Sequence, residues 1–218
     1  KKNRVANKIK INKTEIDKFI GSLPFKLTDS QITAIKEISN DLTKDFPMNR
    51  LLEGDVGSGK TVVAAAAAFA VFLNGFQTII MAPTQILANQ HYETFKQLLT
   101  PFGVRISLIT SDLKKSDLGR NDVFIGTHAL IHSKIAFDKV GLVVIDEQHR
   151  FGVEQRKHLV KKSGTPHTLT MTATPIPRTV ALTSYGDLDL SVLTEMPKGR
   201  LIVTTWFVPE AKRDGAYD

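Results

Sequence analysis

The strongest indication of the fold is one stretch of sequence, Gly54–Asp55–Val56–Gly57–Ser58–Gly59–Lys60–Thr61. It matches the pattern G-x-x-x-x-G-K-[ST], in which glycines let the backbone wrap around phosphate groups. A β-rich run, Arg50–Glu53, precedes it, and an alanine- and valine-rich helical run, Lys60–Leu73, follows. Strand, glycine-rich loop and helix in this order predict a phosphate-binding loop, so we expect all eight residues to contact a nucleotide. The Lys60 ammonium would reach the β- and γ-phosphates, and the Thr61 hydroxyl would bind Mg²⁺.

Strands and helices alternate on both sides of this loop. Helical patterns cover residues 28–43 and 85–99, and further β-rich runs lie at 78–82, 105–109, 122–126, 142–146 and 168–172. Such alternation is typical of parallel strands joined by crossover helices. We therefore predict an α/β fold with a mostly parallel sheet and helices on both faces. Residues 110–120 have no clear period and predict a loop or one short helix.

A second chemical signal follows the apolar run Val143–Val144–Ile145, where Asp146 and Glu147 stand side by side. Because the carboxyl ends of parallel strands share an edge with phosphate-binding loops, the loop and these acids should converge. Asp146 would then hold Mg²⁺, and Glu147 would orient or deprotonate the attacking water. Such an acid pair alone is often only a solvated strand end, but its position after a phosphate-binding loop favours catalysis.

Composition narrows the class of protein. Hydrophobic residues make up 42% and charged residues 23%, which is ordinary for a globular protein. The longest apolar stretch, Val62–Leu73, is too short to cross a membrane, so we expect no membrane partner. The absence of cysteine excludes disulfides and thiolate metal sites and makes the cytoplasm the default location. The net charge of +7 is compatible with an anionic partner.

Much of this positive charge lies at the N-terminus, where residues 1–18 hold seven basic and two acidic side chains. Such runs usually stay solvated and poorly ordered, and contact with nucleic acid is the alternative. We therefore expect residues 1–20 to be a basic arm from an N-terminal region outside this chain. Residues 21–200 would form one nucleotide-binding domain, and residues 201–218 would begin a further domain after a linker at Pro197–Arg200.

The acidic run continues into a family signature. Asp146–Glu147–Gln148–His149 is the DEXH form of the superfamily-2 helicase motif, and Arg150–Phe151–Gly152 extends it as in RecG-type DNA helicases. Three more stretches resemble helicase motifs Ia, Ib and III: Met81–Ala88, Ile125–His128 and Thr172–Thr179. The chain is thus similar to RecG-type helicases over roughly residues 20–218. This resemblance implies a RecA-like P-loop NTPase domain, the first motor domain of an ATP-dependent helicase of DNA repair and recombination, with ATP and Mg²⁺ as cofactors.

The resemblance also implies roles for single residues around the nucleotide. Phe25 and Gln31 take the places of an aromatic residue and a glutamine that bind adenine. A carboxamide can donate to one adenine nitrogen and accept from another, which disfavours GTP. His149 would link the nucleotide site to motif III, where Thr172 and Thr174 would couple hydrolysis to motion.

Other residues would contact DNA or the rest of the motor. The resemblance assigns DNA phosphate contacts to Thr84, Gln85, Thr127 and His128, and phosphate contacts suit a motor that binds every sequence alike. Arg178 lies next to two prolines and would hold a phosphate or an interdomain carboxylate. The implied partners are branched or forked DNA, bound without regard to sequence, and a second RecA-like domain outside these residues. We expect the chain alone to be a monomer with weak or no ATP turnover.

Two alternatives stay open. The transcription-repair coupling translocase has a homologous motor domain and would need RNA polymerase as a partner. Gln148 and the run Ser22–Thr28 favour the RecG type over that translocase. The second alternative is a nucleotide-dependent binding module without motor activity.

Overall fold

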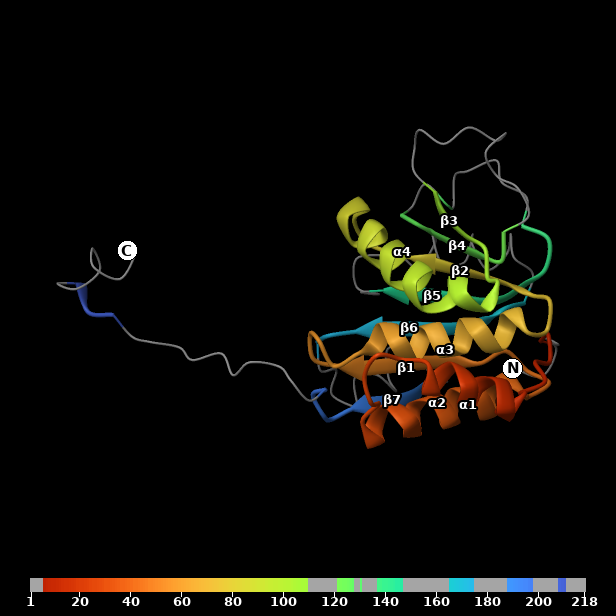
Figure 1. The fold of residues 1–218 in the computed structure, drawn as a ribbon, viewed down its shortest axis with the longest axis horizontal. Coiled ribbons are helices and arrows are strands. Elements are labelled where there is room, and N and C mark those ends of the chain that lie inside the picture. The colour runs from red at the N-terminus through yellow and green to blue at the C-terminus, as the bar shows by residue number, and fades with distance from the viewer. Residues whose placement is uncertain are drawn as a thin grey trace.

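The structure, a computed structural model, describes residues 6–109, 121–127, 130, 137–146, 165–174, 188–197 and 208–210. Helices and strands alternate from residue 29 to residue 109, and the elements given for the later described residues are strands (Figure 1). In chain order they are α1 (Lys13–Gly21), α2 (Asp29–Leu42), β1 (Asn49–Gly54), α3 (Lys60–Phe72), β2 (Gln77–Met81), α4 (Gln85–Leu99), the 3-10 helix η1 (Thr100–Phe102), β3 (Ile106–Ile109), β4 (Val123–Gly126), β5 (Val140–Asp146), β6 (His167–Thr172) and β7 (Asp189–Leu193).

The described strands form one seven-stranded sheet in the order β3-β4-β2-β5-β6-β1-β7. Every neighbouring pair is parallel, which confirms the predicted α/β fold. Parallel strands end at the same edge, so the carboxyl ends of β5, β6 and β1 lie next to one another. The register pairs Asp146 of β5 with Met171 of β6, and Thr172 of β6 with Glu53 of β1. The two segments that the sequence marked as functional therefore end at one edge of the sheet.

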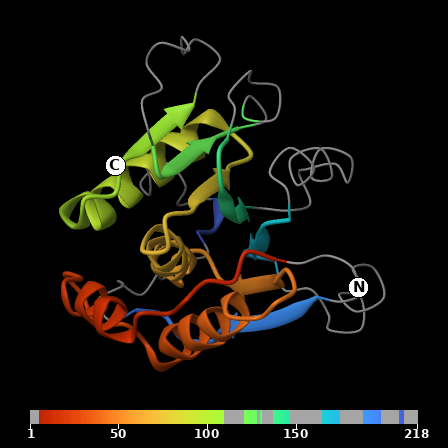
Figure 2. The same cartoon turned by 90° about the vertical axis from the view of Figure 1, so that its right-hand side faces the viewer.

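The central strands send alternate side chains into two cores. Ile80, Leu142 and Val144 face one core, while Val143 and Ile145 face the other. Helices α1 to α4 all contribute to the first core and cover that face of the sheet (Figures 1 and 2). Of the two helical layers that the sequence predicts, the described residues show this one.

The basic N-terminal segment is packed rather than poorly ordered, so the prediction of a poorly ordered arm is wrong for residues 6–20. Asn12 caps α1, and the side chains of Ile9 and Phe19 are fully buried. The Phe19 ring centroid lies 5.4 Å from that of Phe69 in α3. The lysines of this segment point to solvent while its apolar residues enter the core of the sheet. The number of charged residues did not reveal this pattern, because one helix can have a charged face in solvent and an apolar face in the core.

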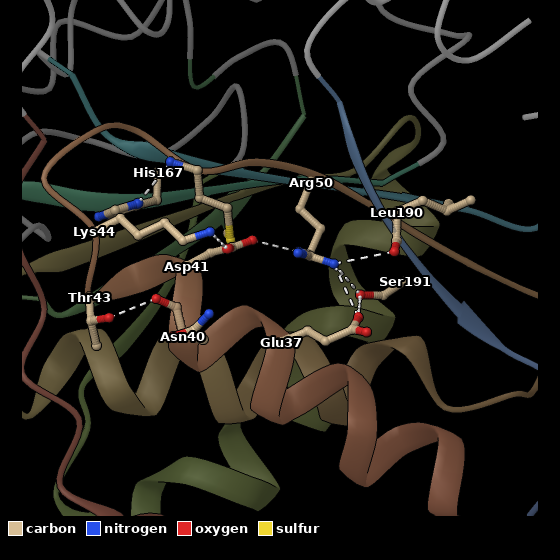
Figure 3. A network of polar contacts seen from close by, with 10 residues as sticks. Glu37, Asn40, Asp41, Thr43, Lys44, Arg50, His167, Leu190 and Ser191 are labelled. Carbon is tan, nitrogen blue, oxygen red and sulfur yellow. Dashed lines mark hydrogen bonds and ion pairs between the residues drawn. The ribbon is translucent and has the colours of Figure 1, made fainter. Parts of the chain in front are cut away.

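A buried ion network fastens the last described strand, β7, which the sequence pattern did not predict (Figure 3). Arg50 of β1 is only 8% exposed, and its Nε donates to Asp41 Oδ2 of α2 at 2.7 Å. Its Nη1 donates to Ser191 Oγ at 2.8 Å and to the Leu190 carbonyl at 3.3 Å, both on β7, and to Glu37 of α2 at 3.1 Å. These contacts join α2, β1 and β7 around one buried cation.

Candidate active site

The predicted phosphate-binding loop connects the end of β1 to the start of α3, and glycine is required in it for two different reasons. Gly59 has φ +85°, a left-handed conformation that side chains disfavour. A Cβ on Gly59 would also lie 2.3 Å from Gln31 Nε2. At Gly54 a Cβ would meet Ser58 Oγ at 2.5 Å. The loop therefore depends on small residues for its shape as well as for space.

The start of α3 is open to an anion. Within the described residues, no side chain caps its N-terminus, whereas side-chain oxygens of Asn12, Thr28 and Thr84 cap α1, α2 and α4. Uncapped N–H groups and the positive end of the helix dipole attract negative charge. Lys60 opens this helix, and its Nζ donates to the carbonyl oxygens of Gly54 at 2.6 Å and Asp55 at 3.1 Å. The lysine thus lies across the loop where phosphates would be bound.

Gln31 braces this loop from α2. Its Nε2 donates to the Ser58 carbonyl at 2.8 Å, and its Oε1 accepts from the Thr28 N–H at 2.9 Å, which completes the capping box of α2. The side chain is 1% exposed. A carboxamide has two N–H groups and two oxygen lone pairs, so one of each remains for an adenine ring. The structure thus adds a loop-bracing role to the adenine contact predicted for Gln31.

A pocket of about 300 Å³ opens beside the loop. Phe25 and Gln31, the residues predicted to bind adenine, both line it, and Phe25 keeps 44% of its surface exposed. The loop contributes Gly59 and Thr61. Three lining residues come from α4, which the sequence did not connect with the nucleotide: Thr94, Gln97 and Leu98. The volume is at the small end of the range for ligand pockets, which fits one base better than a whole nucleotide.

The segment after β7 forms part of this pocket. Pro197 lines it, and the Ser30 N–H at the start of α2 donates to Glu195 Oε1 at 3.1 Å. A carboxylate at a helix N-terminus is favoured by the helix dipole. The sequence did not connect Pro197 or Glu195 with the nucleotide. Ser30 and Glu195 are 165 residues apart, and no local pattern connects them.

Asp146 ends β5 at the same edge, as predicted. Asp146 is 8% exposed, and its Oδ2 lies 2.8 Å from His91 Nε2 of α4. In the described part of the chain, no donor contacts the other oxygen, Oδ1. Two strand spacings, about 10 Å, separate β5 from β1 and its loop. A triphosphate with its metal can bridge such a gap.

Thr172 is the last residue of β6, the strand that lies between β5 and β1, and Thr174 follows two residues later. Their hydroxyls are 2.9 Å apart, and the Thr174 N–H donates to Thr172 Oγ1 at 3.2 Å. Thr172 is buried and Thr174 is exposed. The two threonines therefore lie between the loop and Asp146, where residues that couple these two parts of the site would have to lie.

The predicted DNA contacts lie farther along the same edge. Exposed Thr84 caps α4 by accepting from the Leu87 N–H, and exposed Gln85 is the first residue of that helix. Thr127 follows β4, the neighbour of β2. The described residues thus bring Thr84, Gln85 and Thr127 together at two adjacent strand ends. The other predicted site residues lie outside the described residues: His128, Glu147, His149 and Arg178.

The described residues contain no group of three or more histidine, aspartate or glutamate side chains arranged to hold a metal. Magnesium does not need such a cage, because it usually binds one or two protein oxygens together with waters and substrate phosphates. The Thr61 hydroxyl and the Asp146 carboxylate are oxygen donors of this kind. Among the helices in the described ranges, none has the length and apolar character needed to span a membrane.

Sequence comparisons connect this chain to helicases. A family profile described as "DEAD/DEAH box helicase" matches residues 28–183. The ATP-dependent DNA helicase RecG of Aquifex aeolicus (strain VF5) is 48% identical over 227 residues, which cover 99% of this chain and 29% of that protein. RecG of Escherichia coli (strain K12) is 43% identical over 226 residues, which cover 98% of this chain and 33% of that protein. The chain thus spans about a third or less of these relatives.

Structural comparisons agree. The solved structure of RecG bound to a three-way DNA junction matches with a TM-score of 0.84 and 45% identity, over 98% of this chain and 30% of that chain. The UvsW helicase of bacteriophage T4 matches with a TM-score of 0.65 at 16% identity, over 84% of this chain and 70% of that one, which shows a shared fold. The resemblance to RecG-type helicases predicted from the sequence is confirmed.

Proposed function

Because this chain belongs to the DEAD/DEAH box helicase family, we propose that it is the first RecA-like motor domain of an ATP-dependent DNA helicase of the RecG type. One observation carries the proposal: the braced loop, the open start of α3 and Asp146 all lie at one edge of the sheet. An ATPase needs a phosphate cradle and a metal-holding acid within reach of each other. Domain bounds follow the same proposal, with the motor domain ending near residue 200 and a further domain beginning at residues 201–218.

The nucleotide would bind along the edge from the pocket to Asp146. Its base would lie against exposed Phe25 and receive the remaining N–H and lone pair of Gln31. Its phosphates would accept N–H groups of the loop and of the first turn of α3, and the Lys60 ammonium would bind the β- and γ-phosphates. All of Gly54 to Thr61 would contribute to this cradle.

Magnesium would be held by the Thr61 hydroxyl and the Asp146 carboxylate. When bound, it stabilises negative charge that develops on the phosphoryl oxygens. Glu147 would orient the attacking water and accept its proton. His149 would couple the nucleotide site to Thr172 and Thr174. The position of these threonines between the loop and Asp146 supports this role.

DNA would bind at the ends of β2 and β4. Thr84, Gln85, Thr127 and His128 would contact phosphates rather than bases, so binding would not depend on sequence. Arg178 would contact a phosphate or the neighbouring domain. Branched DNA is the proposed substrate, as in the structure of RecG on a three-way junction.

Efficient hydrolysis would require a second RecA-like domain in cis. Motors of this kind close two such domains over ATP, and the second supplies an arginine for the transition state. The chain alone would therefore bind ATP as a monomer but turn it over slowly. We place this activity in the cytoplasm, because a cysteine-free chain needs no oxidising compartment.

The test is calorimetric titration of the chain with ATP and GTP, in Mg²⁺ and in excess EDTA. We expect ATP to bind more tightly than GTP, and Mg²⁺ to strengthen the binding of ATP. Lys60→Ala should weaken ATP binding about 10- to 100-fold, since a charged hydrogen bond contributes about 1.5–3 kcal/mol. Lys36→Ala, the same change at an exposed lysine of α2, should leave binding unchanged. Tight ATP binding that survives Lys60→Ala would remove the proposal.

A further inference from the structure

The imidazole of His91 contacts the acid that the proposed function assigns to magnesium. Its Nε2 lies 2.8 Å from Asp146 Oδ2, and 55 residues separate the two positions in the chain. The side chains are only 9% and 12% exposed. A buried contact of this length between an imidazole and a carboxylate is a hydrogen bond that water does not weaken. No sequence motif had singled out His91.

His91 belongs to the buried face of α4. The buried residues of this helix are Ala88, His91, Phe95 and Leu99, which recur at helical spacing. The other three are apolar, so the histidine is the exception on a face that packs against the sheet. A buried polar side chain in such a place requires a partner, and Asp146 provides it.

The same helix begins at the proposed DNA contacts. Thr84 caps α4, Gln85 is its first residue, and the helix continues without interruption to Leu99. His91 lies about two turns, or about 10 Å, beyond Thr84. A continuous helix moves as one body, so a shift of its first turn on binding DNA would move the His91 ring as well.

The contact leaves Asp146 suited to bind a metal. Because His91 occupies Oδ2, the carboxylate cannot rotate freely, and Oδ1 has no donor in the described part of the chain. A hydrogen bond from a neighbouring residue commonly orients a carboxylate that binds a metal. Loss of such a partner typically lowers metal affinity or activity about 10- to 100-fold.

We propose that His91 is a positioning residue: its N–H holds Asp146 in the orientation that binds Mg²⁺, and through it α4 connects the DNA-binding edge to the metal. This inference rests on the proposed function, which assigns magnesium to Asp146 and DNA phosphates to the start of α4. In this role His91 would not contact the nucleotide or the metal itself. It acts through the carboxylate it holds.

The first test measures binding rather than turnover. ATP is titrated into the 218-residue chain in Mg²⁺ and in excess EDTA, and the ratio of the two affinities reports the metal. His91→Phe keeps a flat ring but removes the N–H, and we expect the ratio to fall about tenfold while affinity in EDTA stays unchanged. His91→Gln places a carboxamide N–H at a similar reach and should keep the ratio within about threefold of wild type, that is, about 0.6 kcal/mol.

Matched variants separate positioning from general damage. His167→Phe removes another buried histidine, from the start of β6, which is far from Asp146, and it should leave the ratio unchanged. If His91→Phe does not fold, His91→Asn replaces it, because its shorter carboxamide cannot reach Asp146 and must lower the ratio while His91→Gln preserves it. Equal losses in His91→Gln and His91→Phe would overturn the role of the N–H.

Failure of this inference is distinguishable from failure of the proposed function. A wild-type chain whose ATP affinity does not respond to Mg²⁺ would contradict the proposed function. If Asp146→Asn lowers the ratio but His91→Phe does not, Asp146 binds the metal without help from His91, and only the present inference fails. A ratio that rises in His91→Phe would also overturn it, because His91 would then compete with the metal.

The second test addresses the link through α4. Affinity for a fluorescent forked oligonucleotide is measured by anisotropy with and without Mg²⁺ and a non-hydrolysable ATP analogue. We expect nucleotide to change DNA affinity at least about fivefold in the wild type, the lower end of typical coupling. The factor should approach one in His91→Phe and persist in His91→Gln. Coupling that is undiminished in His91→Phe would overturn the link.

Discussion

Two buried aspartates, one in α2 and one at the end of β5, differ in how many hydrogen-bond partners the described residues give them. Asp41 in α2 is 2% exposed, and both of its oxygens accept from cations: Oδ1 from Lys44 Nζ at 2.5 Å and Oδ2 from Arg50 Nε at 2.7 Å (Figure 3). Asp146 is 8% exposed, and a single imidazole contacts one of its oxygens in the described residues. Asp41 therefore holds α2 to β1, whereas Oδ1 of Asp146 has no donor among the described residues.

The surroundings explain the difference. Asp41 belongs to a network in which Arg50 also contacts β7 through Ser191 and the Leu190 carbonyl, so each group has several partners from this chain. Breaking such a network is costly because it leaves a buried charge without a partner. Asp146 is the last residue of β5, at the edge of the sheet where the phosphate-binding loop also lies. Incomplete satisfaction at such an edge indicates a site for a ligand rather than a structural contact.

The largest expected effect compares the same substitution at the two acids. Asp41→Asn should lower the free energy of unfolding by about 3 kcal/mol, because it leaves the buried Arg50 cation without its closest carboxylate. It should leave the Mg²⁺ dependence of ATP binding unchanged. Asp146→Asn should cost about 1 kcal/mol or less, since one hydrogen bond is at stake, but should abolish that dependence. Urea denaturation measures the free energy of unfolding, and calorimetry measures the Mg²⁺ dependence of ATP binding. Equal losses of stability in the two variants would contradict the difference inferred between the two aspartates.

A second pair of substitutions compares two left-handed glycines. Gly75, in the turn after α3, has φ +73°, and a Cβ added there would meet nothing within 4 Å. Gly75→Ala should therefore cost only the conformational strain, about 1 kcal/mol, and leave ATP binding intact. Gly59→Ala adds a clash at 2.3 Å with Gln31 Nε2, which displaces the brace of the loop. Its ATP affinity should fall at least about tenfold, or about 1.4 kcal/mol.

Thermal unfolding measures the stability of the two alanine variants, and calorimetry measures their affinity for ATP. If both alanine variants bound ATP like the wild type, the contact between Gln31 and the loop would have no part in shaping the phosphate cradle.

The smallest effect concerns pH and His167, which lies beside the Asp41 network (Figure 3). Its Nδ1 accepts from the Met48 N–H at 3.0 Å, and its Nε2 bonds to the Asn7 carbonyl at 2.9 Å. Burial lowers the pKa of His167 below its ordinary 6.5, although the Asn7 carbonyl and the charge of Asp41 oppose this. As the pH falls below 6.5, the unfolded chain binds a proton that the folded chain does not, so stability decreases until the lowered pKa is reached.

Urea unfolding between about pH 8 and about pH 5 measures this dependence. The wild type should lose more stability below pH 6.5 than His167→Asn, which has no proton to bind there. Parallel curves for the two proteins would mean that His167 does not contribute to the acid sensitivity of the fold.

Much of the fold could be predicted because its signals are local. The nine predicted strands and helices between residues 28 and 172 agree with the structure to within two residues. The loop from Gly54 to Thr61 is recognisable because its function requires particular residues at consecutive positions. Phe25 and Gln31, which the family resemblance marked, do line a pocket beside that loop. Asp146 ends its strand as the apolar run before it predicts.

The missed features all depend on partners far away in the sequence. Helix α1 looked like a charged arm because its buried face is defined only by the contact with Phe69 and its neighbours. Strand β7 is short and partly polar, and Arg50 fixes it from 140 residues away. His91 resembles any polar residue in an amphipathic helix until β5 places Asp146 beside it.

The order of the amino acids alone predicts the chemistry that we propose for this protein, through a glycine-rich loop, a lysine, a threonine and a strand-terminal acid at recognisable spacings. Backbone conformation and helical or strand period depend on neighbouring residues, so they can be read directly from the order of the amino acids. The contact of Gln31 with the loop and that of His91 with Asp146 become visible in the folded chain alone. Those contacts depend on how strands align and how helices pack across the sheet, and no stretch of sequence contains both partners.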